Sequence, residues 1–590
     1  MIDRKSLIIL LVSATVFAGA WFGIDHLYPP VPRPAMPRPS TNPVAMRSNV
    51  PSEAGSNAIE TTWTANGPVA MATPAEPEQT IQISNQCLVL HFTSHGGGIK
   101  LVELQKYPDA VKRMPGKPAP TNRATMNARA LAPIMAVLGG AQLEGDNSYV
   151  LSQTDHTVRA EKTLSSGLRV VKEFQILTNY QVTAKIRLEN TSATPIALPA
   201  QRVVIGTANA IGLNEDPLVV GVYWYNGTKL EDLKDDWFVN SSLGGCVPGS
   251  PRSEYQGGAG DVVWAAVHSQ FFTLATIPAT NAPKIIVDKI QLPRGSLNDT
   301  SAMTNGFQAA LAYPETALDA GKSIERSYTL YAGPKEYDRL AQIGQKLNNN
   351  LDLIMGFGGF FGFFSKLLLL SMNGLHAIGI KYALAIIFIT IIIKMLFWPL
   401  TNASTKSMKR MQELQPQLKA IADKYKDDPN KKNQKTMEFM KEHKVNPLGG
   451  CLPMLLQIPV FIGFYYMLRS AIELRGESFL WAVDLSQPDT VAYISGVPLN
   501  ILPLLMGITM IWQSGLTPAS PGMDPSQQKI MRWGLPVMML FFFYNMSAGL
   551  TLYWTVQNIL TIVQTKLTKT TNPSGPGAKA GLVALLKKKK

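Results

Sequence analysis

The sequence contains few cysteines and none of the common signatures of an enzyme or a metal site. Its 590 residues include three cysteines, Cys87, Cys246 and Cys451, and seven histidines that are scattered along the chain. No CxxC pair or Cys/His cluster has zinc-site spacing, and the HExxH, GxSxG and P-loop motifs are absent. We therefore expect no catalytic site, no metal and no cofactor. Cys87 and Cys246 either stay free, as buried thiols often do, or pair in an oxidising compartment.

Basic residues outnumber acidic residues in two segments, and these segments supply the whole positive excess of the chain. The formal net charge is +14. Residues 401–447 contain eleven Lys and Arg against six Asp and Glu, and nine Lys and Arg with no acidic residue follow Asp524. A positive net charge of this size is typical of proteins that bind nucleic acid, the ribosome or a membrane surface. Basic segments that alternate with long apolar runs are what the positive-inside rule produces.

The N-terminal segment predicts that the chain beyond it is exported. Arg4 and Lys5 precede an apolar run over residues 7–24. This run is either a cleaved signal peptide or an uncleaved membrane helix, and we expect the anchor, residues 1–27, with its N-terminus in the cytoplasm. Residues 28–79 are rich in Pro, Ser, Thr and Asn and lack apolar periodicity, which predicts a disordered periplasmic linker.

Residues 80–335 have the pattern of a β-sandwich domain. Apolar and polar side chains alternate most clearly over residues 180–188, as in a half-buried strand. Many short strands with Gly, Asn and Pro turns, and without intervening helices, favour a sandwich. The other strand candidates are 81–83, 88–92, 99–104, 170–176, 203–205, 262–267, 271–277, 284–290 and 327–331.

Residues 336–372 predict an amphipathic helix at the membrane surface. Leu340, Ile343 and Leu347 recur at helical spacing with polar residues opposite, and a stretch rich in Gly and Phe comes next. A helix that lies in the interface would have this pattern. The alternative is a helix that packs on the β-sandwich.

Five apolar spans come after this helix, at residues 375–400, 448–468, 497–512, 533–545 and 550–563. The last three have 13 to 16 residues, so as helices they reach only about 20–24 Å, against a hydrocarbon core of about 30 Å. Either flanking residues extend these helices, or the bilayer is thinner beside them. Together with the N-terminal helix, the spans predict six transmembrane helices.

The predicted orientation agrees with the charge pattern. The second transmembrane helix, residues 373–400, leads into the basic segment 401–447, and helices three to six lie within 448–567. The basic loop 401–447, the loop 516–531 and the basic tail 568–590 then lie in the cytoplasm with both chain ends. Within 401–447, two amphipathic stretches, 404–425 and 431–444, predict a helical hairpin that is either a partner-binding element or a solvated connector.

Lys394 is the one basic residue within an otherwise apolar stretch, and it is a candidate functional residue. A cation in the hydrocarbon core is costly, although Lys394 is close enough to the cytoplasmic end for its amine to reach the headgroups instead. Thr390 lies one turn away on the same face. Polar residues that converge from several helices would form a hydrated cavity, whereas singly they serve as helix–helix hydrogen-bond partners. The others are Gln457, Thr509, Gln513, Gln557, Asn558 and Thr561.

Several motifs resemble those of the YidC/Oxa/Alb family of membrane protein insertases. They are NPLGGCLPMLLQIPVF at 446–461 with YYML at 465–468, DP with QQKIM between 524 and 531, SAGLTLYW at 547–554, and YAGPK at 331–335. The order of elements resembles the Gram-negative form over essentially the whole chain. The resemblance implies an α+β membrane protein of the inner membrane, with a five-helix core, a hydrophilic groove and a large periplasmic domain.

The family resemblance also implies a function and a set of groove residues. It implies an insertase and chaperone for nascent membrane proteins, acting alone or with the Sec translocon, without nucleotide hydrolysis and without DNA. The single cation of the family's groove matches Lys394, where bacterial members usually have Arg, and Tyr553 and Trp554 match an aromatic pair. The candidate groove residues are Lys394, Thr390, Gln457, Thr509, Gln557, Asn558, Tyr553 and Trp554.

The basic C-terminus is a candidate contact site, and two other classes of protein are alternatives to an insertase. Lys587, Lys588, Lys589 and Lys590 suit contact with the ribosome or with anionic membrane lipids. A small-solute transporter would use polar residues in a bundle equally well, but no repeat relates the helices. A membrane-anchored hydrolase would need a carboxylate pair or nucleophile set, which we do not find.

Overall fold

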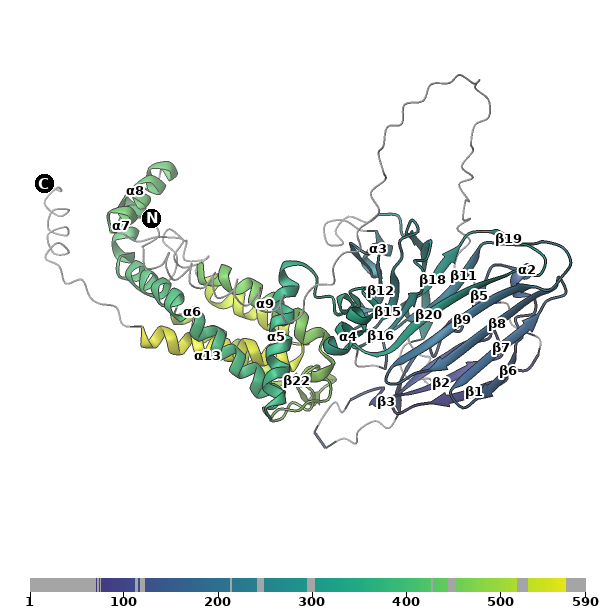
Figure 1. Ribbon diagram of the computed structural model, residues 1–590. Coiled ribbons are helices and arrows are strands. Elements are labelled where there is room, and N and C mark those ends of the chain that lie inside the picture. Colours follow the sequence, from purple (N-terminus) through teal and green to yellow (C-terminus); the bar gives the residue numbers. More distant parts are fainter. Residues whose placement is uncertain are drawn as a thin grey trace, which may run out of the picture.

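The computed structural model describes residues 76–111, 115–116, 122–212, 215–240, 249–293, 303–425, 428–443, 452–516 and 529–568, together with residues 71 and 74. The described chain forms a β-rich part and a helical part that lie end to end (Figure 1). The expected first helix, residues 1–27, most of the linker 28–79, and the tail from residue 569 lie outside the described residues.

Two antiparallel sheets form most of the β-rich part. The nine-stranded sheet has the order β13-β12-β15-β16-β20-β9-β8-β7-β6, and the five-stranded sheet has the order β14-β17-β18-β11-β5. The nine strands are β6 (Val150–Thr154), β7 (Thr157–Thr163), β8 (Leu168–Ile176), β9 (Gln181–Asn190), β12 (Gly221–Tyr225), β13 (Leu230–Leu233), β15 (Trp264–His268), β16 (Phe272–Pro278) and β20 (Ser323–Pro334). The five are β5 (Val137–Leu138), β11 (Gln201–Ala208), β14 (Glu254–Gly257), β17 (Lys284–Pro293) and β18 (Met303–Tyr313).

Two smaller sheets complete this part. A four-stranded sheet contains β1 (Thr80–Ser84), β2 (Leu88–Thr93), β3 (Gly98–Pro108) and β4 (Arg123–Met126), and β10 (Ile196–Leu198) pairs with β19 (Thr316–Leu318). The expectation of no helices between the strands was wrong, since α2 (Ala141–Glu144), η1 (Pro217–Val219) and α3 (Asp235–Val239) lie there. Elements of one turn are too short to show a 3.6-residue period in sequence.

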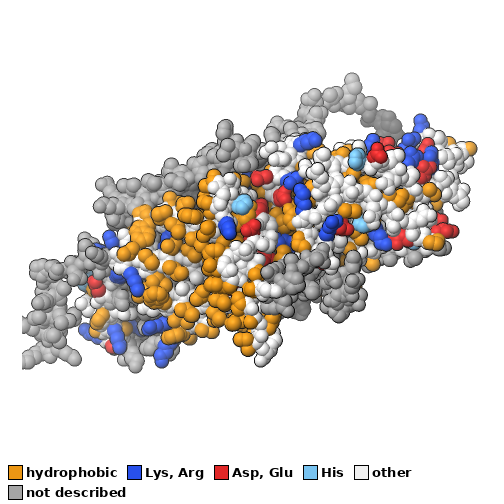
Figure 2. Space-filling model, turned by 90° about the horizontal axis from the view of Figure 1, so that it is seen from below, with side chains coloured by type: hydrophobic (Ala, Val, Ile, Leu, Met, Phe, Trp, Pro, Cys, Tyr) orange, Lys and Arg blue, Asp and Glu red, His pale blue; other side chains and the backbone are white. Residues whose placement is uncertain are grey.

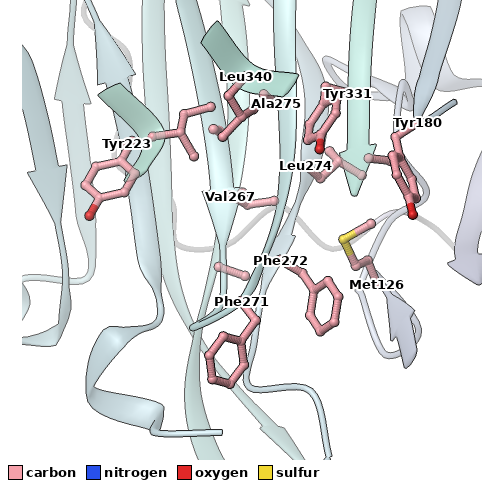
Figure 3. Packing of buried hydrophobic residues seen from close by; sticks show 14 of the residues in the cluster. Met126, Tyr180, Tyr223, Val267, Phe271, Phe272, Leu274, Ala275, Tyr331 and Leu340 are labelled. Carbon is pink, nitrogen blue, oxygen red and sulfur yellow. The ribbon is translucent and has the colours of Figure 1, made fainter. Parts of the chain in front are cut away.

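The hydrophobic core follows from strand alternation. In β9 every second residue, from Val182 to Leu188, is buried, as the sequence predicts. Figure 3 shows part of this core, where Leu274 of β16, the register partner of Val267 in β15, lies beside Tyr331 of β20, and Leu340 lies on a helix above the strands.

The segment expected as one helix over 336–372 is divided into three elements. They are α4 (Tyr337–Leu347), η3 (Leu351–Met355) and α5 (Gly359–Ala377). Asn348 and Asn350 adopt left-handed conformations, with φ of 52° and 51°, which end α4. The apolar face of α4 is buried in the core of the β-rich part, so this helix follows the alternative of packing on the sheets.

The helical part contains α6 to α13. Its elements are α6 (Tyr382–Glu413), α7 (Gln415–Lys424), α8 (Pro429–Glu442), α9 (Leu452–Ser470), η5 (Ile472–Leu474), β21 (Thr490–Ile494), β22 (Val497–Asn500), α10 (Ile501–Leu516), the π-turn η6 (Ile530–Gly534), α12 (Leu535–Phe543) and α13 (Ala548–Leu567). By length and composition, one described helix, over Tyr382–Met411, can cross a membrane, while Ile501–Leu516 and Arg532–Phe543 are shorter apolar helices. Figure 2 shows hydrophobic side chains gathered over this part, with Lys and Arg at its far end.

Three expected boundaries in the helical part were wrong. Helix α6 does not end at residue 400 but continues through Pro399 to Glu413, and the hydroxyl of Thr401 donates to the Phe397 carbonyl there. The span expected from residue 497 begins as strand β22, and its helix begins at Ile501. The last span is not short, because α13 has 20 residues and is therefore about 30 Å long.

Candidate functional site

Lys394 lies inside the helical part. Its side chain is 6% exposed, and Nζ donates a hydrogen bond of 2.8 Å to Oγ1 of Thr561 on α13. The amine is therefore held between α6 and α13 rather than extended toward the end of its own helix. Thr390 is also buried, but its hydroxyl donates to the Ile386 carbonyl in the same helix at 2.6 Å. Thr390 thus lines the same face without a hydrogen bond to Lys394.

Helix α13 connects the other polar candidates. Asn558 lies three residues before Thr561 on α13, and its Nδ2 donates a hydrogen bond of 3.2 Å to Oγ1 of Thr509 on α10. Since residues three apart share a helix face, α13 presents polar groups to α6 and to α10 within one turn. The side chain of Gln557 is half-buried and makes no hydrogen bond within the described residues.

The aromatic pair lies in a different environment. Tyr553 is fully buried and stacks on Phe464 of α9 with 4.2 Å between ring centroids, and Gln457 of α9 lies near its hydroxyl. Trp554 contacts Phe461 edge to face at 4.6 Å. Tyr553 precedes Thr561 by eight residues, or about 12 Å along the helix. The structure therefore places the candidates in two groups, a polar one around Lys394 and an aromatic one between α13 and α9.

Several residues that the sequence did not single out extend the polar group. Nε2 of Gln564 donates to Oγ1 of Thr401 at 2.5 Å, and the Thr568 hydroxyl donates to the side-chain carbonyl of Asn402 at 2.9 Å. With Lys394 and Thr561, these contacts form a polar seam between α6 and α13. The spacing of Thr561, Gln564 and Thr568 at three and four residues was the available signal, because it puts all three on one face.

The charge of Lys394 has no acidic partner among the described residues. Its amine makes the one hydrogen bond to Thr561, a neutral group, and no ion pair. A charge in an apolar region normally pairs with an opposite charge or faces water. Lys587 to Lys590 lie outside the described residues, and within these residues no group of three or more His, Cys, Asp and Glu could hold a metal ion.

A second buried polar cluster lies in the β-rich part. Nζ of Lys335 is 3.1 Å from Nδ1 of His268, whose ring stacks on Tyr223 with 4.1 Å between centroids. Burial, assisted by the charge of Lys234, lowers the pKa of Lys335 to about 7, while Glu215 and Asp232 oppose the shift. Burial and the Lys335 charge lower the pKa of His268. Cys87 is a buried free thiol, and Cys246 lies outside the described residues.

The fold and this site define a class of protein that joins a large β-rich domain to a bundle of apolar helices with one buried cation. Family models for the 60Kd inner membrane protein and for the YidC periplasmic domain match residues 374–574 and 80–370. The membrane protein insertase YidC of Geobacter metallireducens is 32% identical over 95% of this chain and 97% of its own, and that of Pelobacter propionicus is 32% identical over 95% and 98%. The chain belongs to the YidC family of membrane protein insertases.

A solved structure also matches. The crystal structure of an active YidC insertase with its first transmembrane domain resolved is 18% identical, covers 85% of this chain and 95% of its own, and has a TM-score of 0.33.

Proposed function

We propose that this protein inserts and folds membrane proteins in the bacterial inner membrane, as the names of its relatives state for them. The observation that carries the proposal is Lys394, a buried cation whose contact among the described residues is the neutral Thr561. An acidic or strongly polar segment of a nascent chain would supply the missing partner. The cation is therefore a transient receptor for substrate rather than half of a fixed ion pair.

The proposed topology has six transmembrane helices, with both chain ends in the cytoplasm and the β-rich domain in the periplasm. Residues 1–27 form the anchor, 28–79 the linker and 80–335 the periplasmic domain, and α4 and α5 join this domain to the bundle. Helices α6, α9, α10, α12 and α13 form the core. The π-turn and α12 together cover 14 residues, or about 21 Å, so the bilayer thins beside them.

The proposed mechanism is a lowering of the barrier for polar segments. A charged residue at the bilayer centre costs about 2.5–3.5 kcal/mol on insertion scales. A hydrophilic groove beside the polar seam, lined by Lys394, Thr390, Gln557, Asn558 and Thr509, replaces part of the lost hydration. The hydrophobic segment of the substrate then gains free energy by moving into lipid. The mechanism needs no nucleotide and no covalent step.

In this proposal, Gln457, Tyr553 and Trp554 act by packing and by positioning the helices, not through charge. Because Tyr553 is fully buried, the aromatic packing holds α9 and α13 together, about 12 Å along α13 from Thr561. The polar hairpin of α7 and α8 and the lysines at 587–590 are the proposed contacts for the ribosome and for anionic lipid. The Sec translocon is a further proposed partner, with the protein acting either alone or beside it.

Proteoliposomes that contain only this protein test the proposal. The substrate is a short two-helix protein with an acidic exported loop, and the readout is protection of that loop from protease. We expect Lys394→Glu to reduce protection at least tenfold, since it reverses the receptor charge, and Lys394→Arg to retain most of it. Protection of a substrate with a neutral exported loop should be much less sensitive to Lys394→Glu. Equal loss with both loops would contradict the electrostatic mechanism.

A further inference from the structure

The hairpin between α9 and α10 has an apolar tip. Strands β21 and β22 are joined by Ser495 and Gly496, whose φ values of 50° and 82° form a tight two-residue turn. Beside the turn, Tyr493, Ile494 and Val497 are 53%, 62% and 59% exposed. The tip of a hairpin in water usually carries polar side chains. The apolar side chains of this tip are exposed, so we expect lipid or protein to cover them.

The base of the hairpin is polar and fixed. The side chain of Asn500 is fully buried, donates to the Tyr544 carbonyl at 2.7 Å and accepts from the Thr490 hydroxyl at 2.7 Å. The hydroxyl of Tyr544 donates to the carbonyl of Pro498 at 2.6 Å. The hairpin is thus attached to the end of α12, and Figure 1 shows β22 at the end of the bundle that faces the β-rich part. Its apolar tip is held in a fixed position.

The exposed apolar surface continues from the hairpin along α10. Ile508 and Trp512 are 61% and 51% exposed, and no charged residue occurs between Asp489 and Asp524. Helix α10 has 16 residues, or about 24 Å, which is about 6 Å less than the hydrocarbon core. The four residues of β22 add up to about 13 Å of extended chain, so the hairpin covers this difference.

We propose that the hairpin of residues 490–500 is a lipid anchor that lies in the periplasmic headgroup region of the bilayer. The outer edges of a two-stranded hairpin carry unpaired N–H and C=O groups, which would be costly in hydrocarbon but are satisfied by water and headgroups at the interface. Tyr493 suits this depth, where aromatic side chains gather. The anchor extends the short helix α10 and fixes the depth of the α12–α13 connection in the bilayer. The inference rests on the membrane-spanning position of α10 in the proposed function.

Depth-dependent quenching tests the anchor. Cys87, Cys246 and Cys451 are replaced, and single cysteines are introduced at Ser495 in the hairpin turn, at Ile508 on α10 and at exposed Ser152 in the β-rich part. Each carries an environment-sensitive fluorophore in full-length protein in vesicles of phosphatidylethanolamine and phosphatidylglycerol. We expect the Ser495 label to shift to shorter wavelength and to be quenched most by lipids with a nitroxide at the headgroup. The Ile508 label should respond most to a nitroxide deep in the acyl chain, and the Ser152 label only to aqueous iodide.

Each other result overturns the anchor in a recognisable way. A Ser495 label that only iodide quenches places the tip in water, and one that neither iodide nor lipid quenches shows that protein covers it, either a partner or a second copy. If the Ile508 label keeps its lipid response in these cases, the proposed span stands and the anchor alone fails. Loss of the lipid response at Ile508 would count against the span itself. Tyr493→Cys repeats the measurement beside the turn.

Discussion

Lys335 is a residue whose burial makes the stability of the β-rich domain depend on pH. Its folded pKa of about 7 lies below the usual 10.5. Between these values the unfolded chain binds a proton that the folded chain does not, so stability rises with pH, by up to about 1.4 kcal/mol per pH unit. We expect Lys335→Met to remove this rise between pH 7.5 and 9.5, below the range in which tyrosines ionise. The measurement is the urea midpoint of the full-length protein in detergent, followed by circular dichroism.

A matched control separates this effect from a general change of charge. Lys229→Met removes a lysine of the same domain that is fully exposed and paired with Glu231. Its pH profile should follow that of the unaltered protein. If Lys335→Met and Lys229→Met have the same slope, Lys335 is protonated in the folded domain and the prediction is wrong.

Individual residues also show what the sequence could and could not predict about the site. Lys394 was recognisable because a single cation stands out in an apolar run, and Thr561 was recognisable as polar. Their hydrogen bond depends on how α6 and α13 pack, which no local pattern contains. The same applies to Gln564 and Thr401, whose contact joins residues 163 positions apart. The positions of Tyr553 and Trp554 against α9 likewise follow from tertiary packing.

At the scale of elements, the seam between α6 and α13 combines a structural and a functional role. Gln564 bonds across the seam to Thr401 and to the Trp398 carbonyl, whereas Gln557, two turns earlier on the same helix, makes no side-chain hydrogen bond within the described residues. We expect Gln564→Leu to destabilise the helical part by about 1 kcal/mol, the usual size for such bonds between membrane helices. Thermal unfolding in detergent measures this loss.

We expect Gln557→Leu to affect insertion and not stability, in contrast to Gln564→Leu. The substitution leaves the seam intact, so the unfolding temperature should not change. As a proposed groove residue, Gln557 should instead affect insertion of the acidic-loop substrate, with a two- to fivefold decrease expected. A loss of stability in Gln557→Leu, or unchanged stability in Gln564→Leu, would show that the seam is assigned incorrectly.

Elements differ in how well the sequence predicts them. Strand β9 was clear, because strict apolar/polar alternation over residues 180–188 has one interpretation. The end of α6 was missed because the apolar run ends at Leu400, although the helix continues with hydroxyl-to-carbonyl bonds from Thr401 and Thr405. The hairpin of β21 and β22 was read as loop and helix, since a short uncharged apolar run fits either structure.

At the scale of the whole molecule, residues in the last turn of α9 and just after it connect the helical part to the β-rich part. Arg469, in the last turn of α9, pairs with Asp216, and its carbonyl accepts a hydrogen bond of 2.9 Å from Gln270. Arg475 donates to the carbonyl of Pro108 at 2.8 Å, and its guanidinium lies 5.4 Å from the ring of Phe272. The β-rich domain is therefore held directly on α9, as well as through the chain connection at α4.

These contacts predict that the two parts move as one body. Spin labels at Ser152 in the β-rich part and at Ile559 on α13, in the cysteine-free protein, should give a narrow distance distribution by double electron–electron resonance. We expect Arg475→Ala to broaden this distribution at least twofold, because Arg475 is largely buried and its loss removes the contacts with the carbonyls of Pro108 and Asp109 and with the ring of Phe272. Arg159→Ala is the control, since Arg159 pairs with Glu161 and Glu173 inside one sheet. An unchanged distribution in Arg475→Ala would mean that α4 and its packing alone orient the domain.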